Sequence, residues 1–473
     1  MDKSRGNTFF LAMIGISSIM VLIGGSMLAH ANETLDALIV VILFYVAGFF
    51  PLAVFFPGRK PELRAFVLTY GICVLMGGMS QLYSLFNTGD LQSTPDAQMF
   101  FSLISASPPF TEMADLPVNF NSPLAVVLWQ LLYKGAWSLG LSFGLYTAIT
   151  LNSFVVAFSG FLTVRIARDL FGNDTRKLHF VGLLFSLCGM FWLFGAIMIR
   201  DCFILLINTL VLWALVRWVE FPRSVRLYVA VIGGCISGFC MWYLRKETIY
   251  LYGVFFVIAL SAWYVRERIN AQRLSVICIT IAILLVSYSY IEQLIGAARE
   301  EQVTNMQRYG ETGLASSRSG SLGAQLILVQ PMPVRLVVGS VYIVLYPIPL
   351  WAYFFSGASE YNILKNCHGI FQVLTIPLFI AALLLLVRNA ARDIQAALPY
   401  IFLASSFVVS ILAVASTSIE TRHYGQFLPA YLICMAIPDL RKQSDRSLTF
   451  RIAAIWFGII AVVQVLWAVL RFV

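Results

Sequence analysis

Long apolar runs recur along this chain, and they constrain its fold more than any other feature. A membrane-spanning helix needs about 20 predominantly apolar residues, and runs near that length cover most of the sequence. The runs are Phe9–Met27, Leu38–Phe56, Phe66–Phe86, Leu145–Ile166, Leu178–Met198, Phe203–Trp218, Leu227–Leu244, Ile249–Val265, Val276–Ile295, Val337–Phe355, Phe371–Val387, Leu398–Ala415, Phe427–Met435 and Ile452–Phe472. The pattern predicts an all-α, polytopic transmembrane bundle of about 13 spans, forming one integral membrane domain over residues 1–473.

Charge is scarce and is confined to the connections between these runs. A mean hydropathy of +0.84 with 12% charged residues excludes an ordinary soluble enzyme. The net charge of +9 lies in short loops, which is typical of topology signals, so we expect no nucleic-acid partner. The eight cysteines fall within or beside apolar runs, without metal-ligand spacing or a secreted disulfide pattern.

One segment, Asn87–Ser122, has 36 residues without a single Lys or Arg, yet it carries four acids. Because basic residues are retained on the cytoplasmic side, this segment is predicted to be an outer loop. The acids are Asp90, Asp96, Glu112 and Asp115. The basic groups predicted to lie inside are Lys3/Arg5, Arg59/Lys60/Arg64, Arg165/Arg168/Arg176/Lys177, Arg217/Arg223/Arg226, Arg266/Arg268/Arg273, Arg388/Arg392 and Arg441/Lys442/Arg446.

Alternation between the two sides makes three local predictions. Only one span can follow the acid loop before the next basic loop, so Pro123–Leu139 is expected to be an interfacial helix. The Pro-containing run Val337–Phe355 is expected to be broken or re-entrant. The first run is followed by Ala29-His30-Ala31, as in a signal peptide, but it is long for that role and is interpreted as a retained span.

Several basic residues break the positive-inside trend by lying in predicted outer connections. Arg200 stands beside Asp201 in one tight turn, and another turn reads Arg245-Lys246-Glu247. The outer loop 297–335 and the turn Glu420-Thr421-Arg422-His423 hold more of them. The candidate anion-binding residues are Arg200, Arg245, Lys246, Arg308, Arg318 and Arg422. Solvated helix ends are the alternative interpretation, and His423 fits an interfacial polar tip better than a catalytic base.

Carboxylates on one outer loop and cations on its neighbours suit a single kind of reaction. A carboxylate can activate an acceptor hydroxyl, while Arg or Lys stabilises a departing phosphate. A divalent metal, Mg²⁺ or Mn²⁺, is a possible cofactor because it could bridge carboxylate and phosphate. The sequence has no zinc-ligand spacing, no P-loop and no serine-hydrolase or metalloprotease motif.

The order of these elements resembles the GT-C type glycosyltransferases, which use polyprenyl-phosphate sugars and include the protein mannosyltransferase-like and lipid A sugar transferase families. The resemblance lies in an acid-bearing outer loop, then NSPLAVVLWQLLYKGAWSLGL, then LNSFVVAFSGFLTVRIARDLFG, and then an apolar run and Arg200-Asp201. It covers Thr94–Trp218, about a quarter of the chain. By this likeness a GT-C-like core extends over about 66–300, flanked by the outer loops 87–122 and 297–335.

The resemblance implies Asp96 and Asp201 as catalytic acids, with basic residues of later outer loops gripping the lipid phosphate. The partners implied are a polyprenyl-phosphate-linked sugar donor, a glycan or lipid acceptor and membrane lipids, at a bacterial inner membrane with the site facing the periplasm. Two departures are visible: the acid loop follows the third apolar run rather than the first, and Ala97 follows Asp96 where many members have an acid.

Two alternatives stay open at this point. Arg200 beside Asp201 resembles the polymerases of O-antigen and exopolysaccharide repeat units, which also act on lipid-linked sugars. A polymerase or ligase is therefore one alternative. A secondary transporter or flippase is another, although such proteins favour charges at midmembrane depth and internal repeats.

Overall fold

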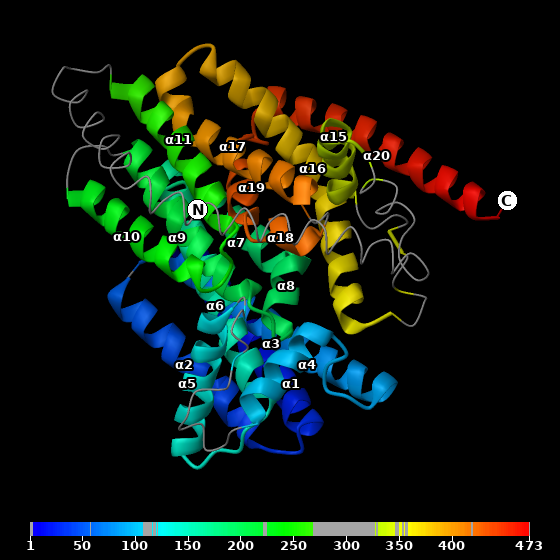
Figure 1. The fold of residues 1–473 in the computed structure, drawn as a ribbon. Coiled ribbons are helices and arrows are strands. Elements are labelled where there is room, and N and C mark those ends of the chain that lie inside the picture. The colour runs from blue at the N-terminus through cyan, green and yellow to red at the C-terminus, as the bar shows by residue number, and fades with distance from the viewer. Residues whose placement is uncertain are drawn as a thin grey trace, which may run out of the picture.

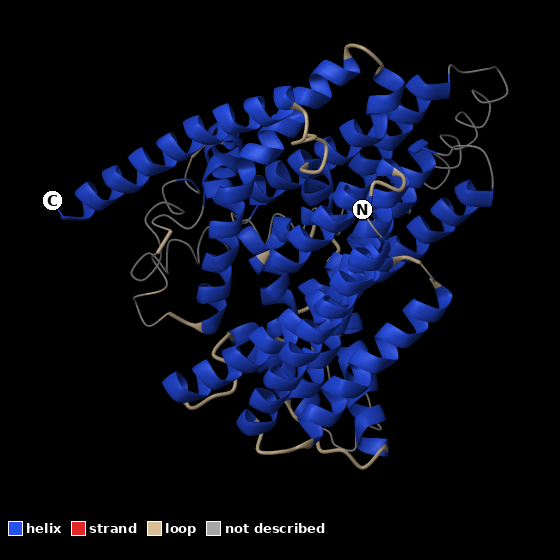
Figure 2. Cartoon of the chain, turned by 180° about the vertical axis from the view of Figure 1, so that it is seen from behind, coloured by secondary structure: helices blue, strands red, loops and turns tan. Residues whose placement is uncertain are grey.

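The computed structural model is a bundle of helices (Figure 1). It describes residues 3–56, 58–106, 116, 120, 122–220, 225–267, 327, 330–345, 350–351, 354, 358–417 and 420–472. Figure 2 shows helices and loops and no strand in these ranges. The predicted all-α fold class is confirmed.

Most of the long helices begin and end close to a predicted apolar run, but α16 and α20 begin well before theirs. They are α1 (Lys3–Ala31), α2 (Asp36–Phe55), α3 (Lys60–Thr88), α4 (Pro95–Ser105), α5 (Pro123–Ser138), α6 (Leu145–Phe171), α7 (Thr175–Leu187), α8 (Gly189–Ala196), α9 (Asp201–Glu220), α10 (Val225–Trp242), α11 (Thr248–Glu267), α15 (Met332–Leu345), α16 (Glu360–Ala390), α17 (Ile394–Thr417), α18 (Thr421–Gly425), α19 (Leu428–Cys434) and α20 (Gln443–Phe472).

Within the described ranges, nine helices are long and apolar enough to cross a membrane. The pair α7 and α8, bent by 54°, makes a tenth if it is one span. The chain is therefore a multi-pass helical membrane protein. The expected count of 13 is not confirmed. The run Val276–Ile295 lies outside the described residues, and the described parts of α10 and α15 are shorter apolar helices.

The apolar run Phe427–Met435 is not a span in this structure. Its helix, α19, has 7 residues, all of them buried, and Pro429 lies in its first turn. A helix of that length extends only about 10 Å. It packs inside the bundle, where the Tyr431 hydroxyl is 2.8 Å from the Thr375 hydroxyl. High hydropathy here reflects burial in protein, which hydropathy alone does not distinguish from contact with lipid.

The segment after the acid loop forms a helix where one was predicted. In α5 the Trp129 indole donates to the Asn152 side chain at 2.8 Å, and the Tyr133 hydroxyl donates to the Gly144 carbonyl at 2.6 Å. Leu131, on the opposite face, and Trp137, in the last turn, are exposed. This amphipathic form suits the expected interfacial position. For the predicted broken run, α15 ends at Leu345, and residues 346–349 lie outside the described ranges.

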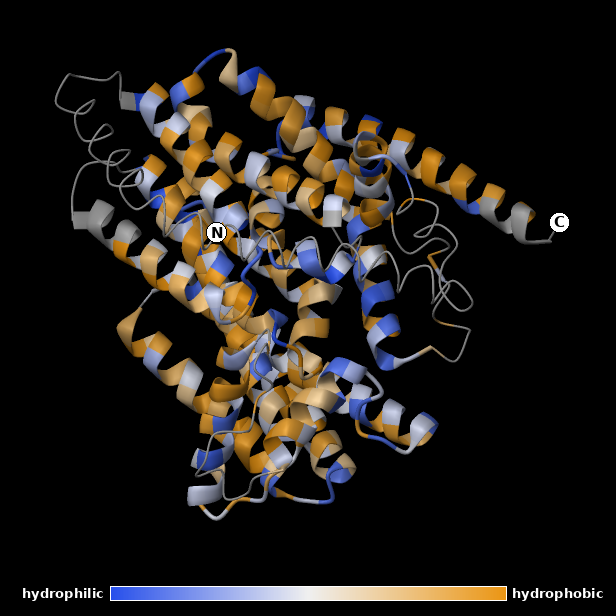
Figure 3. Ribbon diagram, in the orientation of Figure 1, coloured by the Kyte–Doolittle hydropathy of each residue, from blue (hydrophilic) through white to orange (hydrophobic). Residues whose placement is uncertain are grey.

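The centre of the bundle is formed by α3 and α6. Their most apolar windows are 72% and 83% buried, against 17% in α2 and 6% in α20. Figure 3 shows the peripheral α20 coloured as hydrophobic along much of its length, as expected of a helix facing lipid. Glycine permits the close contact of α1 with α3: a Cβ atom at Gly24 would lie 2.7 Å from the Leu75 backbone.

Three spans connect two chemically distinct faces of the bundle. Helix α9 begins at Asp201 and ends at Glu220, and α16 runs from Glu360 past Arg388. Helix α11 follows the Arg245 turn and reaches Arg266. Their far ends line one cavity with other basic residues that were predicted to lie inside. A 20-residue helix is about 30 Å long, so the near ends of these spans form a separate face.

Candidate functional site

Asp96 and Arg422 form an ion pair between segments that are 326 residues apart. Asp96 lies in the first turn of α4, after Pro95, and Arg422 lies in α18. Proline suits the first position of a helix and an acid suits its first turn, which fixes the start of α4 here. An Arg422 Nη1–Asp96 Oδ2 distance of 2.8 Å joins them, with 18% and 46% of the side chains exposed. The acid loop thus meets a late basic turn, within reach of solvent.

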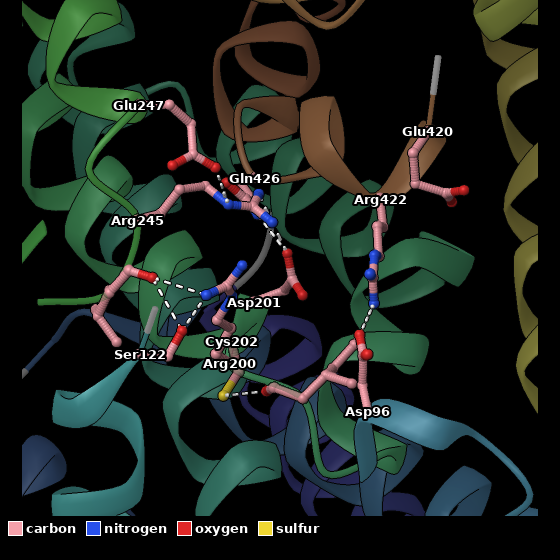
Figure 4. Close-up of polar contacts among 12 residues, drawn as sticks. Asp96, Ser122, Arg200, Asp201, Cys202, Arg245, Glu247, Glu420, Arg422 and Gln426 are labelled. Carbon is pink, nitrogen blue, oxygen red and sulfur yellow. Dashed lines mark hydrogen bonds and ion pairs between the residues drawn. The ribbon is translucent and has the colours of Figure 1, made fainter. Parts of the chain in front are cut away.

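Asp201, the second predicted acid, lies deeper. It is the first residue of α9 and is only 2% exposed. The Gln426 side-chain amide donates to Asp201 Oδ1, and Arg245 Nη1 is 3.7 Å from the same oxygen. Arg245 Nε also lies 3.2 Å from Glu247 Oε1. Figure 4 shows these residues converging from three separate connections.

Arg200 holds two loops together at the side of this group. Its guanidinium donates to Ser122 Oγ, just before α5, and to the Leu244 carbonyl at 3.2 Å. The Ser122 hydroxyl donates to the same carbonyl at 3.1 Å. A hydrogen bond also joins the acid loop to this turn, because the Met198 amide donates to Gln92 Oε1 at 3.3 Å. The turn that carries Arg200 is therefore ordered by its neighbours.

The other predicted basic residues are less central. Lys246 lies over the Trp242 ring, with Nζ 5.3 Å from the ring centre. Arg308 and Arg318 fall outside the described residues, so their predicted role stays a prediction. Of the remaining loop acids, Asp90 is exposed and accepts only a 3.4 Å hydrogen bond, from Gln98.

The first turns of α16 add charged residues that the sequence analysis did not select. Lys365 Nζ is 2.7 Å from Glu420 Oε1, and the Tyr361 hydroxyl donates to the same oxygen at 3.1 Å. The Arg422 guanidinium lies 5.9 Å from the Tyr361 ring centre. Lys365 could have been identified from the sequence, because a charged residue just inside an apolar helix is energetically costly and usually has a functional role. The run was instead taken to begin at Phe371.

Glu360 fixes the entry to α4. It is 3% exposed, and its carboxylate accepts from the Ser93 amide at 2.8 Å and the Ser93 hydroxyl at 2.6 Å. The Thr94 hydroxyl lies at 3.4 Å from the same group. These residues immediately precede Asp96, so Glu360 determines where Asp96 is presented.

We use the term polar cluster for the residues assembled at this face. Its members are Asp96, Ser122, Arg200, Asp201, Arg245, Lys246, Glu247, Glu360, Tyr361, Lys365, Glu420, Arg422, His423 and Gln426. They come from six connections or helix ends.

Comparison with protein-family models and with curated proteins finds no match for this chain.

Burial and neighbouring charges shift three ionisable groups in the turn at residues 420–423. Burial lowers the pKa of Arg422, but Tyr361, Asp201, Asp96 and Glu420 outweigh it and raise the pKa well above its ordinary value. Burial raises the pKa of Glu420, but Lys365 and Arg422 bring it below the usual value. The pKa of His423 is held well below 6.5 by burial and then by the surrounding cations, Arg245 first. Arg422 is thus charged and His423 neutral at pH 7.

These shifts predict a protein that loses stability in acid. Because the folded-state pKa values of His423 and Glu420 are both lowered, the unfolded chain binds more protons, and stability rises with pH. The His423 contribution falls away below pH 6.5 and that of Glu420 below 4.5. Thermal unfolding in detergent should show an apparent Tm that falls from pH 7.5 to 4.5. In His423→Gln the fall between pH 6.5 and 5 should be smaller, and an unchanged slope would contradict the assignment.

The Glu360 contacts predict a distinct phenotype for Glu360→Gln. The amide keeps the size of the side chain but loses charge and one acceptor, and hydrogen bonds to a charged group are worth about 1.5–3 kcal/mol. Amide hydrogen exchange over residues 93–98 should therefore become faster, and activity per folded molecule should fall about tenfold. Glu33→Gln, at an exposed loop acid, should change neither. Unaltered exchange in Glu360→Gln would show that the Glu360 contacts with Ser93 and Thr94 do not hold this segment in place.

The described residues offer a divalent metal no site of their own. Among them, no three His, Cys, Asp or Glu side chains come close enough to share an ion. Asp96, Asp201 and Glu420 each face a guanidinium or ammonium group instead. Within the described residues these acids are paired with cations, and the dependence on Mg²⁺ or Mn²⁺ stays a prediction. What the cluster can supply is a partly exposed carboxylate beside several cations.

Proposed function

We propose that this protein is an integral-membrane glycosyltransferase. It would take a sugar from a polyprenyl-(di)phosphate carrier and transfer it to an envelope glycan or lipid acceptor. The observation that carries the proposal is the Asp96–Arg422 pair, which unites a partly exposed base with a cation at the end of the spans. The GT-C-like pattern of the sequence adds support. We further propose the bacterial inner membrane, with the polar cluster facing the periplasm, because the opposite face gathers the basic loops.

In the proposed reaction, Asp96 accepts the proton of the acceptor hydroxyl. The acceptor oxygen forms a bond to the anomeric carbon, and the bond from that carbon to the phosphate oxygen breaks. The lipid phosphate leaves with the electron pair and with its negative charge. Attack opposite the leaving group inverts the anomeric configuration. Arg422, and Arg245 behind it, would stabilise the departing phosphate through charge-assisted hydrogen bonds.

The charge balance of the polar cluster suggests how Asp96 is released for this task. Five acids oppose five Arg or Lys side chains in the cluster (Asp96, Asp201, Glu247, Glu360 and Glu420 against Arg200, Arg245, Lys246, Lys365 and Arg422). An anionic donor therefore needs a cation that can leave its partner. Arg422 suits this need because its partner is the most exposed acid among the ion pairs that involve the cluster. As Arg422 turns to the phosphate, Asp96 becomes a free base.

Asp201 has a different place in the proposal. At 2% exposure, with Gln426 and Arg245 as partners, it is positioned to orient Arg245 rather than to meet an acceptor. We therefore assign it as a positioning acid, and not as the second catalytic acid that the family likeness implies. Arg200 has a similar supporting role, because its donors are used by Ser122 and Leu244.

A repeat-unit polymerase is the second candidate, favoured by Arg200 and Asp201 standing together in one turn. It would use the same lipid carriers and the same face. A transporter is less well supported, because the clustered charges lie at helix ends and in connections.

A deletion strain tests the proposal and separates its two forms. Envelope glycan extracted from wild type, deletion and complemented strains should be compared by electrophoresis and mass spectrometry. Loss of one sugar supports a transferase, and loss of chain length supports a polymerase. Glycan of unchanged composition and length in the deletion strain would contradict both.

A further inference from the structure

A second polar site lies at the opposite end of the bundle from the polar cluster. It is a cavity of about 990 Å³ lined by the ends of α6, α9, α11 and α16, the starts of α7 and α17 and the segment leading into α20. Six basic side chains line it: Lys177, Arg266, Arg388, Arg392, Arg441 and Lys442. Five acids also line it: Asp174, Glu220, Asp393, Asp439 and Asp445.

Part of this charge is already neutralised by ion pairs. Arg266 Nη1 is 2.9 Å from a carboxylate oxygen of Glu220. Arg441 is 2.7 Å from Asp439 and 3.9 Å from Asp174. These ion pairs join neighbouring segments of the cavity wall, and the paired side chains contribute little net positive charge to the cavity.

Four basic side chains remain, and one of them, Lys177, donates to the Ile437 carbonyl at 3.3 Å and lies over the Phe171 ring. Arg388, Arg392 and Lys442 form no ion pair in the part of the chain that the structure describes, and all three are exposed. The two remaining acids serve the backbone instead. Asp393 accepts from the amide of residue 396, and Asp445 accepts from the amide of residue 439, each at 3.1 Å. The six basic and five acidic side chains leave the cavity a net charge of +1, and the three cations without an ion-pair partner are available to contact an anion.

Apolar surface adjoins these cations. Leu385 and Leu386 line the cavity itself, while their neighbours on α16, Leu384 and Val387, are 51% and 71% exposed. Because α16 is a candidate membrane span, we expect this exposed face to meet the lipid chains. An occupant with an anionic head and an apolar tail can thus satisfy both surfaces at once.

We propose that this cavity binds the phosphate head group of an anionic phospholipid from the adjoining leaflet. Arg388, Arg392 and Lys442 contact the phosphate, and the acyl chains follow the outer face of α16. Basic pockets between spans are a known means of holding anionic head groups, and guanidinium is well matched to phosphate. The site is independent of the proposed glycosyltransferase activity, and it is distinct from the polar cluster.

The test uses the full-length protein in detergent, titrated with dioleoyl phosphatidylglycerol or dioleoyl phosphatidylcholine. Native mass spectrometry counts retained lipid, and thermal unfolding reports stabilisation. The cavity variant is Arg388→Gln/Arg392→Gln/Lys442→Gln. The matched control is Arg176→Gln/Arg446→Gln/Arg451→Gln, which removes the same charge from exposed residues that do not line the cavity. Inorganic phosphate and glycerol 3-phosphate are titrated in parallel.

Wild type and the control variant should retain phosphatidylglycerol in preference to phosphatidylcholine. The cavity variant should need at least about tenfold more phosphatidylglycerol for the same stabilisation. Equal binding of both lipids by wild type would overturn the proposal, as would equal loss in the control variant. Protection by the two soluble phosphates as strong as that by the lipid would also overturn it, since the site would then take a soluble anion. If the triple variant does not fold, Arg392→Gln alone should show a smaller shift in the same direction, and no shift would count against the site.

Discussion

Asp96→Asn is expected to lower the rate of sugar transfer about 10²- to 10⁴-fold, the usual contribution of a general base. The amide keeps the shape of the side chain and can still contact Arg422, but it cannot accept the acceptor proton. Asp96 is 46% exposed, and exposed ion pairs contribute only about 0.2–1 kcal/mol. The protein should therefore insert and unfold as wild type does. The measurement is glycan formed per molecule of membrane-inserted protein.

Asp90→Asn is the matched control for this change. Asp90 lies on the same loop, five residues before α4 begins, and is exposed with only a weak contact to Gln98. Asp90→Asn should leave glycan formation within about twofold of wild type, as is usual for surface changes. Equal loss in both variants would assign the effect to the charge of the loop rather than to Asp96.

Asp201→Ala is expected to be the most destabilising single change at the polar cluster, at about 3 kcal/mol. Removing one partner of a buried pair leaves the other charge uncompensated, which costs about 3–5 kcal/mol. Asp201 and Arg245 are 2% and 6% exposed. The lower end applies because Glu247, 3.2 Å from Arg245, remains as a partner. The readout is the midpoint of unfolding by denaturant in mixed micelles.

A double-mutant cycle separates the pair from its surroundings. Arg245→Met removes the guanidinium, so Asp201→Ala should cost less in that background than in wild type. Equal cost in the two backgrounds would show that the Gln426 hydrogen bond, and not the ion pair, accounts for the loss. If Asp201→Ala left stability unchanged but abolished transfer, Asp201 would be acting on the substrate, contrary to its assignment as a positioning acid.

Much of the fold follows from hydropathy because a bilayer admits few alternatives. Runs such as Leu145–Ile166 became spans, since only a helix satisfies its own backbone in lipid. The run Phe427–Met435 misled because burial within protein also favours apolar residues, and α19 is buried throughout. The order of the charged loops predicts that α5 lies at the interface, and this position stays a prediction, although the segment does form a helix.

Only part of the candidate site could be predicted from the sequence. A loop without basic residues drew attention to Asp96, but nothing local indicated that Arg422 would face it from 326 residues away. Lys365 and Glu360 were missed because they precede the apolar run that was used to predict the span, so they were not assigned to its helix. Their significance depends on tertiary contacts with Glu420 and Ser93, and spacing along the chain does not encode those contacts.

The most direct test of the central claim is cleavage of a lipid-linked sugar by the purified protein. Wild type, Asp96→Asn and Asp90→Asn would be reconstituted with radiolabelled polyprenyl-linked sugars and acceptor extracted from the native envelope. Release of free polyprenyl phosphate or diphosphate, together with label in the acceptor, would be followed over time. We predict release and transfer by wild type and Asp90→Asn, and neither by Asp96→Asn. Equal release by wild type and Asp96→Asn, or no release by wild type, would contradict the account.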